Sequence, residues 1–196
     1  MKKIISLLII ITFILNTELL AENTEKIKRI TEGDLNSKIT IIAYESLTCG
    51  HCADFHKNVY PKLKENFIEK GLVKIEFRHF PLDIAAFNAS KIGQCNNDGK
   101  SDLMHILYYG QEKWAKGETS EEATRNLKNF LVDEGIDINF EKCISDKNIE
   151  DYILNDRIEG VKKFKVNATP TIIINDKRFE KALNYKNLKK YLEKLI

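Results

Sequence analysis

The chain has 196 residues with 31 basic and 29 acidic side chains, which leave a formal net charge of +2. No run of basic residues stands out, and this argues against nucleic-acid binding. The length suits one domain of ordinary size that carries a large insertion.

Residues 1–21 have the order of a secretory signal peptide. Lys2 and Lys3 precede an apolar run from Ile4 to Leu15, and the small residue Ala21 stands before a charged stretch. The run is shorter than the roughly 20 residues that a membrane-spanning helix needs. We therefore expect cleavage after Ala21, with an uncleaved anchor as the alternative. Export places the protein in an oxidising compartment, the periplasm if the leader is bacterial.

Strand, helix and strand are predicted in turn after a polar lead-in. Residues 38–44 are apolar and β-branched, as in a strand buried on both faces. The helical spacing of apolar residues after Cys52 predicts a helix over 49–70, kinked at Pro61 because proline has no N–H to donate. The alternation in 73–78 predicts a half-covered strand, parallel to the first.

Residues 83–165 show three- and four-residue apolar spacing and no convincing strand. They predict a block of several helices, divided at 96–99, Gly117 and Gly135. The block separates residues 22–82 from 166–196, which we expect to form one α/β domain together.

Strand signals return in the last part of the chain. Residues 170–176 predict a buried strand, and 177–179 a partner strand across a short Asn-Asp turn. A final amphipathic helix is predicted over 185–196, with an apolar stripe formed by Leu188, Leu192 and Leu195.

The stretch "TCGHC" places Cys49 and Cys52 at the start of the first helix. Cys52 lies on the apolar stripe and should be buried, whereas Cys49 should be exposed at the first turn. A helix N-terminus stabilises a thiolate through its free N–H groups and partial positive charge. A protonated or hydrogen-bonding His51 would add to this effect. Gly50 has no side chain to block an approaching disulfide, so the pattern predicts a reactive dithiol.

Two other interpretations of the cysteine pair remain. A structural disulfide between Cys49 and Cys52 would close only a small ring, which contributes little stability. A zinc site needs four ligands, and only His56 lies nearby at ligand-like spacing. We predict no metal and no cofactor.

A second signal is "NATPTIII", in which Thr169 and Pro170 precede a buried strand. Such a proline is either an ordinary strand-entry residue or a cis-proline fixed by tertiary structure. Together with "KITIIAYESLTCGHCADFHKNVYPKLKE" and "VKIEFRHFPLD", this segment resembles the DsbA-like thiol-disulfide oxidoreductases of the thioredoxin-fold superfamily. The likeness covers nearly all of residues 33–196.

The resemblance implies a fold and roles for particular residues. The fold would be an α/β thioredoxin fold with an inserted all-helical domain. Cys49 would be the attacking cysteine and Cys52 the resolving one. Pro170 would be a cis-proline packed beside the disulfide, and Thr169 would tune the redox potential and the substrate contacts.

Three features depart from the best-known members of this family. The pair Gly50–His51 replaces their Pro-His and is similar to the pair in eukaryotic protein disulfide isomerases. Thr169 is similar to the residue of isomerase-type relatives, where the strongest oxidases carry Val. Ala43 stands where many relatives have a buried acid, and Glu45 on the same strand face is a candidate substitute.

Cys95 and Cys143 fall in the helical block. We predict a structural disulfide between them, with a second redox pair or free thiols as alternatives. His56 and His79 lie near the ends of predicted elements and could border the site, although an isolated His is more often a satisfied polar residue. His105 receives no role. We expect the aromatic residues Trp114, Tyr108 and Tyr109 in the core rather than in a binding groove.

These observations predict a periplasmic protein-disulfide oxidoreductase that introduces disulfides into exported cysteine-containing proteins. By the resemblance, a quinone-linked membrane protein of the DsbB type would reoxidise the protein. The alternatives are an isomerase or reductase that works from the reduced dithiol, and a binding protein without redox turnover. An intact C-x-x-C argues against the last. The short stretch between Ala21 and the first strand leaves little room for a dimerisation domain, which favours the oxidase.

Overall fold

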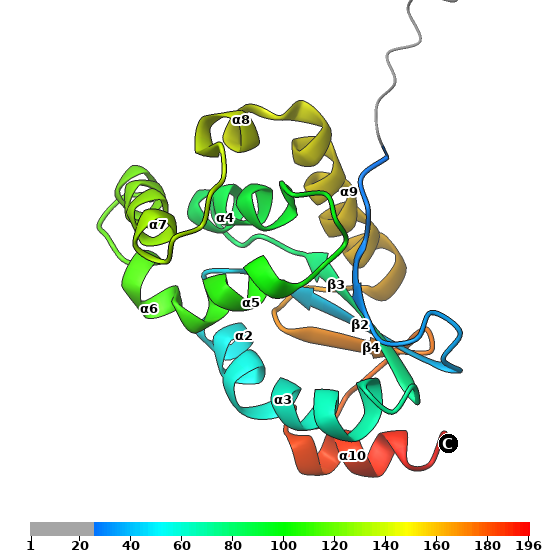
Figure 1. The fold of residues 1–196 in the computed structure, drawn as a ribbon. Helices are drawn as coiled ribbons and strands as arrows, with labels where there is room; N and C mark the ends of the chain where they lie inside the picture. The colour runs from blue at the N-terminus through cyan, green and yellow to red at the C-terminus, as the bar shows by residue number, and fades with distance from the viewer. Residues whose placement is uncertain (1–25) are drawn as a thin grey trace, which may run out of the picture.

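The computed structural model describes residues 26–196, in which a five-stranded mixed sheet carries helices on both faces (Figure 1). The leader predicted for residues 1–21 lies outside the described residues. Across the sheet the strands lie in the order β1 (Ile30–Glu32), β3 (Val73–His79), β2 (Ile39–Glu45), β4 (Thr171–Ile174) and β5 (Lys177–Arg178). Within residues 26–196 no helix is both long enough and apolar enough to cross a bilayer.

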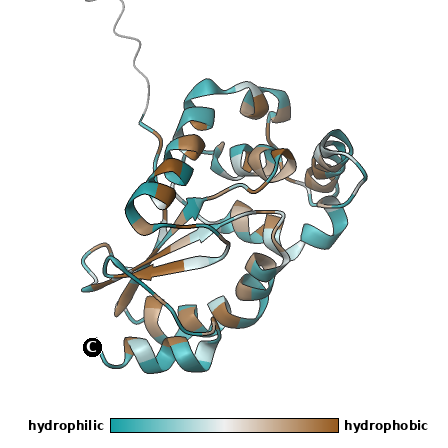
Figure 2. Ribbon diagram, turned by 180° about the vertical axis from the view of Figure 1, so that it is seen from behind, coloured by the Kyte–Doolittle hydropathy of each residue, from teal (hydrophilic) through white to brown (hydrophobic). Residues whose placement is uncertain are grey.

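The strands have the burial that their sequence patterns predict. β2 runs parallel to β3 and antiparallel to β4, which confirms the predicted parallel pair. β2 and β4 are buried along almost their whole length, whereas β3 alternates between buried and half-buried residues. Figure 2 shows largely apolar strands in the sheet and helices of mixed character around them.

Strand β1 is absent from the sequence-based prediction, which treats this segment as a polar lead-in. Ile30 pairs with Phe77 and Glu32 with Ile75, so β1 adds an antiparallel edge to β3. Three residues are too few for an alternating pattern to be recognised.

The first helix follows the predicted range as one run of alternating α and π turns. It consists of α2 (Gly50–Asp54), η2 (Phe55–Val59), α3 (Tyr60–Leu63) and η3 (Lys64–Ile68), where η denotes a π turn. The disturbance expected at Pro61 takes the form of η2, in which the Tyr60 N–H donates to the Phe55 carbonyl. A π turn is a known way for a helix to change its hydrogen-bond register near a proline.

The helical block predicted for residues 83–165 contains six helices. They are α4 (Ile84–Gln94), α5 (Asp102–Tyr109), α6 (Gln111–Trp114), α7 (Ser120–Asp133), α8 (Phe140–Ser145) and α9 (Lys147–Phe164). The predicted breaks are confirmed, because Asn97, Gly117 and Gly135 all have positive φ between helices. The break at Gly110 was not predicted. Glycine is needed there because a Cβ would meet the Phe130 ring, and not because the backbone has a positive φ.

The two faces of β2 contribute to two separate cores. Ile39, Ile41 and Ala43 belong to the larger core, which also includes side chains of the first helix, α5 and the C-terminal helix α10 (Tyr185–Leu192). Ile42 and Tyr44 on the opposite face belong to a smaller core that contains side chains near the end of α9. This division fixes the first helix over one face of the sheet and α9 over the other (Figure 1).

Some predictions about single side chains are confirmed and others are wrong. Trp114 and Tyr108 are buried, as expected, but Tyr109 is half exposed. Leu188 and Leu192 of α10 are buried, whereas Leu195 lies beyond the end of the helix and is 43% exposed.

The turn between β4 and β5 matches its prediction. Asn175 and Asp176 both have positive φ, at 47° and 62°, as a two-residue hairpin turn requires.

Candidate functional site

Cys49 and Cys52 lie where β2 passes into the first helix. Cys49 is the N-cap residue of α2, with extended backbone, and its N–H donates to the Ser46 carbonyl at 3.0 Å. Its side chain is partly exposed, while Cys52, three residues further on, is completely buried. This is the arrangement that the sequence predicts. Both cysteines are in the thiol form in this structure.

The surroundings of Cys49 favour its thiolate. A hydrogen bond from the Cys52 side chain lowers the pKa of Cys49 most, against the opposing effect of burial. The Thr169 side chain and the backbone N–H groups of Cys52 and His51 lower it further, so that the pKa falls from 9.0 to about 5. At neutral pH the reduced protein therefore carries a nucleophilic sulfur at position 49.

Cys52 has the opposite tendency. Burial raises its pKa most, and the hydrogen bond to Cys49 and the charge of Glu45 raise it further. The two sulfurs are thus chemically distinct, one an exposed thiolate and the other a buried thiol. The thiolate is the form that attacks disulfides.

His51 lies beside Cys49 in the first turn of the helix. Its side chain is exposed, and its favourable effect on Cys49 comes from its backbone N–H. At Gly50 a Cβ would meet no atom within 4 Å, so the front of the site is open at this position.

The segment before β4 lies beside Cys49. The Thr169–Pro170 peptide bond is cis, as the resemblance implies. Cys49 Sγ lies 3.3 Å from the Thr169 carbonyl oxygen. The Thr169 backbone therefore lies directly beside the reactive sulfur.

A cleft of about 310 Å³ opens between the first helix and the segment that contains Thr169 and Pro170. Its lining comes from the first helix, the cis-proline segment and the approach to α10, and consists of His51, Asp54, Phe55, Thr169, Pro170 and Leu183. The cleft borders Cys49 through Thr169, whose carbonyl oxygen contacts the Cys49 sulfur.

Gln111 of α6 holds the loop before the dithiol and was missed by the sequence analysis. Its side-chain amide donates to the carbonyls of Leu47 at 2.7 Å and Cys49 at 3.1 Å. No local pattern marks this glutamine, since it reaches the loop from the helical block.

Behind Cys52 four polar side chains form a hydrogen-bonded chain. Glu45 contacts His56, His56 contacts His105, and His105 contacts Glu32. His56 was predicted as a residue that could border the site. Its ring is fully buried, so it lies in the interior and not at the exposed side of the dithiol. His105, for which the sequence suggested no role, contacts His56.

The other residues singled out from the sequence lie apart from the dithiol. His79 is buried and lies 3.3 Å from the side-chain oxygen of Gln94, and burial lowers its pKa. Cys95 and Cys143 form the predicted disulfide, which joins the end of α4 to α8.

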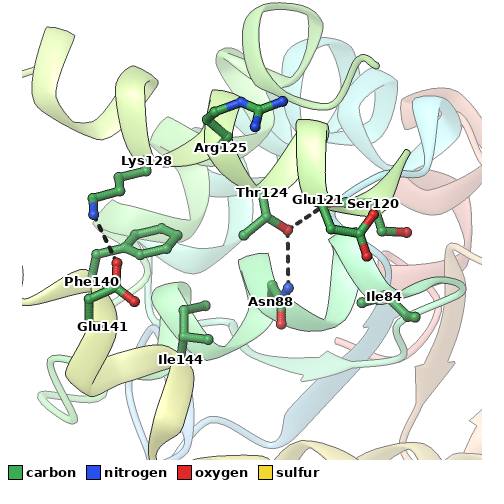
Figure 3. Close-up of a pocket in the computed structure, with 10 residues that line it drawn as sticks. All are labelled: Ile84, Asn88, Ser120, Glu121, Thr124, Arg125, Lys128, Phe140, Glu141 and Ile144. Atoms are coloured by element: carbon green, nitrogen blue, oxygen red, sulfur yellow. Dashed lines mark hydrogen bonds and ion pairs between the residues drawn. The ribbon is translucent and has the colours of Figure 1, made fainter. Parts of the chain in front are cut away.

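A second pocket, of about 350 Å³, lies between α4, α7 and α8 (Figure 3). Asn88 donates to the Thr124 hydroxyl at 3.1 Å, and Lys128 pairs with Glu141 at its rim. Its lining contains neither cysteine nor histidine. Among residues 26–196 no group of three or more His, Cys, Asp or Glu side chains is arranged to hold a metal ion.

Comparison with known proteins gives consistent matches over most of the chain. The family model described as thioredoxin matches residues 25–194. A candidate protein-disulfide oxidoreductase of Rickettsia bellii is 27% identical over 150 residues, which is 73% of this chain and 55% of that protein. Disulfide bond formation protein D of Bacillus subtilis is 24% identical over 175 residues, 83% of this chain and 74% of that protein.

A solved structure agrees in fold as well as in sequence. The crystal structure of Wolbachia pipientis α-DsbA1 superposes with a TM-score of 0.76 at 29% identity, covering 91% of this chain and 94% of that one. The chain spans about half the length of the first rickettsial relatives it matches.

Proposed function

Because this chain belongs to the thioredoxin family and is a DsbA-like member of it, we propose that it exchanges disulfides with proteins and acts in the oxidising direction. The observation that carries the proposal is the contrast between the Cys49 thiolate and the buried Cys52 thiol. A protein that stabilises its reduced form in this way has an oxidising disulfide, because reduction yields a stable thiolate.

The proposed reaction begins with the oxidised Cys49–Cys52 pair. A substrate thiolate attacks Cys49 Sγ, the exposed sulfur, and Cys52 leaves and takes up a proton. The second thiolate of the substrate then attacks the substrate sulfur that is bonded to Cys49. This step forms the substrate disulfide and releases Cys49 as a thiolate. The substrate loses two electrons as its disulfide forms, and the Cys49–Cys52 pair gains them.

The cleft beside Cys49 supports an extended polypeptide as the substrate. Thr169 and Pro170 line the cleft together with His51 and Leu183. The open space over Gly50 leaves room for the incoming chain. We propose exported cysteine-containing proteins as substrates and the periplasm as the location.

Reoxidation completes the cycle. The Cys49 thiolate attacks the disulfide of an oxidant, and Cys52 then displaces that oxidant from Cys49. By family analogy we propose a DsbB-type membrane protein as this oxidant. The nucleophile in this step is the Cys49 thiolate, which its surroundings stabilise.

The first test is the equilibrium of the Cys49–Cys52 pair with glutathione, combined with transfer of a disulfide to a reduced peptide that contains two cysteines. We expect the oxidised protein to oxidise the peptide stoichiometrically, and Cys49→Ser to abolish the transfer. An equilibrium close to that of thioredoxin would contradict the oxidising role and favour the reductase or isomerase direction.

Refolding of a scrambled protein with several disulfides separates oxidase from isomerase. We expect slow reshuffling by the reduced protein compared with rapid oxidation of a reduced substrate by the oxidised protein. If Cys49→Ser binds peptides as well as the wild type, and the wild type transfers no disulfide, the chain is a binding protein instead.

A further inference from the structure

The proposed exchange reaction needs a proton path to Cys52. Cys52 leaves the Cys49–Cys52 disulfide as an anion when the mixed disulfide forms and must gain a proton, and it must lose that proton again before it attacks Cys49. Its side chain is completely buried, so the path runs through protein groups rather than directly into bulk water.

Glu45, at the end of β2, is the carboxylate beside Cys52. It is 3% exposed, and its charge acts on Cys52 strongly enough to contribute to the raised pKa of that thiol. Oε2 lies 2.9 Å from Nε2 of His56. Oε1 is buried and has no hydrogen-bond partner among the described residues. One oxygen of Glu45 is therefore engaged, and the other has unused acceptor capacity in the interior that also holds Cys52.

His56 continues the chain from Glu45. It follows Cys52 by four residues in the same helical run, which places the two side chains on one face, and its ring is 0% exposed. Nδ1 of His56 lies 2.9 Å from Nδ1 of His105 on α5. The Tyr108 ring stacks on His56 with centroids 4.0 Å apart and holds the imidazole in this orientation.

The chain ends at Glu32 on β1, near the surface. Nε2 of His105 lies 2.8 Å from Glu32 Oε1, and Tyr60 and Ser101 donate their hydroxyls to the same carboxylate. Burial alone would raise the pKa of Glu32, but these hydrogen bonds lower it to about 2. Lys64, whose side chain is 43% exposed, pairs with Glu32 at 3.2 Å.

The contacts along this chain are continuous. Each of the three contacts that join Glu45, His56, His105 and Glu32 has a ring nitrogen that can donate or accept a hydrogen. They therefore form an unbroken path along which a proton can pass from one group to the next.

We propose that Glu45, His56, His105 and Glu32 form a proton relay that connects Cys52 with solvent near Lys64. The inference rests on the proposed function, since it explains how Cys52 gains and loses its proton during exchange. When Cys52 attacks Cys49, its proton passes to Glu45 Oε1, each imidazole accepts one proton and gives up another, and Glu32 releases one to solvent. The reverse transfer protonates Cys52 when it leaves the disulfide. Cys52 is the catalytic residue. The four relay residues carry its proton between the sulfur and solvent.

Oxidised glutathione separates the two steps of the chemistry. The Cys49 thiolate of the reduced protein attacks glutathione disulfide and releases one glutathione thiolate, forming a mixed disulfide. Cys52 then attacks Cys49 Sγ and releases the second glutathione. The protein dithiol loses two electrons, glutathione disulfide gains them, and the Cys52 proton leaves through the relay. Only this second step requires proton transfer from Cys52.

His56→Gln and His105→Gln test the relay, with rapid-mixing measurement of both steps between pH 5 and 9. Their expected effect is about tenfold or more on the second step, with a changed pH profile, because general acid-base groups contribute effects of this size or larger. The first step should stay within twofold of wild type. His79→Gln is the matched control, a buried histidine outside the relay, and both of its steps should equal those of wild type.

Wild-type rates and pH profiles in both relay variants would overturn the relay. If the variants do not fold, imidazole nitrogen NMR of the wild-type protein decides the question. The signals of His56 and His105 should shift between the reduced and oxidised protein, and unchanged signals would overturn the proposal. The glutathione assay needs no peptide substrate. A protein that resolves glutathione normally but oxidises no peptide would therefore contradict the proposed function and leave the relay intact.

Discussion

At the scale of single residues, the environment divides two chemically identical side chains into different roles. Cys49 caps the first helix and receives hydrogen bonds from the Cys52 side chain and from backbone N–H groups, whereas Cys52 lies in the core. Burial penalises a charge and hydrogen-bond donors stabilise it, so the two thiols shift in opposite directions.

The first prediction concerns the ionisation of Cys49 in the reduced protein. Its thiolate absorbance should titrate with a midpoint near pH 5, and its alkylation rate should rise through the same pH and then level off. Cys49→Ser should remove both signals. A midpoint near 8.5, as in free cysteine, would contradict the structure.

The same pKa shift predicts how stability depends on pH. The folded-state pKa of Cys49, about 5, lies below its ordinary value of 9.0, so ionisation favours the folded reduced protein. This contribution is complete above pH 9 and is lost as the pH falls through 5. The melting temperature of the reduced form, relative to the oxidised form, should therefore rise from pH 5 to pH 9. A constant difference would exclude the shift.

At the scale of elements, two glycines show how closely two helices pack against their neighbours. A Cβ at Gly160 would lie 2.8 Å from Cε1 of Tyr44, whose ring is fully buried between β2 and α9. A Cβ at Gly93 in α4 would lie at an ordinary 3.7 Å from Leu107. Both glycines are in helices, so alanine has the same intrinsic advantage at each.

Alanine at these two positions should have opposite effects. Gly160→Ala should destabilise the protein by about 1–3 kcal/mol through overpacking, less the gain in helix propensity. Gly93→Ala should stabilise it by up to about 1 kcal/mol. Denaturant unfolding measures both. Equal effects from the two substitutions would show that α9 can move away from Tyr44.

A second prediction at this scale concerns α6, which supports the loop before the dithiol. Gln111→Ala would leave the buried carbonyl of Leu47 without its donor, at a cost of about 1–3 kcal/mol. Glu112→Ala on the same helix removes only an exposed pair with Lys57 and should leave the stability close to that of the wild type, because solvent screens exposed ion pairs.

The measurement is denaturant unfolding, together with the alkylation rate of Cys49. Gln111→Ala should lower the unfolding midpoint and alter the alkylation rate, because the Cys49 carbonyl also loses its donor. Equal behaviour of the two variants would exclude a supporting role for Gln111.

At the scale of the whole molecule, one disulfide and one sheet hold together segments that are distant in sequence. The Cys95–Cys143 bond spans 48 residues of the helical block. β2, which leads to Cys49, and β4, which follows Pro170, come from opposite ends of the described chain and pair side by side. The helical block therefore lies between the two segments that form the site.

Removing the disulfide should weaken the fold without changing the dithiol. The chain-entropy relation gives about 4 kcal/mol for a loop of this length, so Cys95→Ala with Cys143→Ala should lower the free energy of unfolding by up to that amount. The Cys49 titration midpoint should stay where it is in the wild type. A shift of that midpoint would show that the two cysteine pairs are coupled.

Local patterns were sufficient for most of the fold. The buried runs, the alternating strand and the glycine breaks each arise from interactions within a few residues, and the dithiol is marked by its own spacing. Strand β1 was missed because three residues carry no period. Gln111 and the contact between His56 and His105 were missed because they depend on which helices meet, and no spacing within one segment encodes that.

The cleft beside the dithiol and the far end of the buried polar chain have no residue in common. His51 and Leu183 line the cleft, whereas Glu32 pairs with the half-exposed Lys64. If the proposed relay operates, docking of a partner and release of hydrogen ions use different entrances to the molecule.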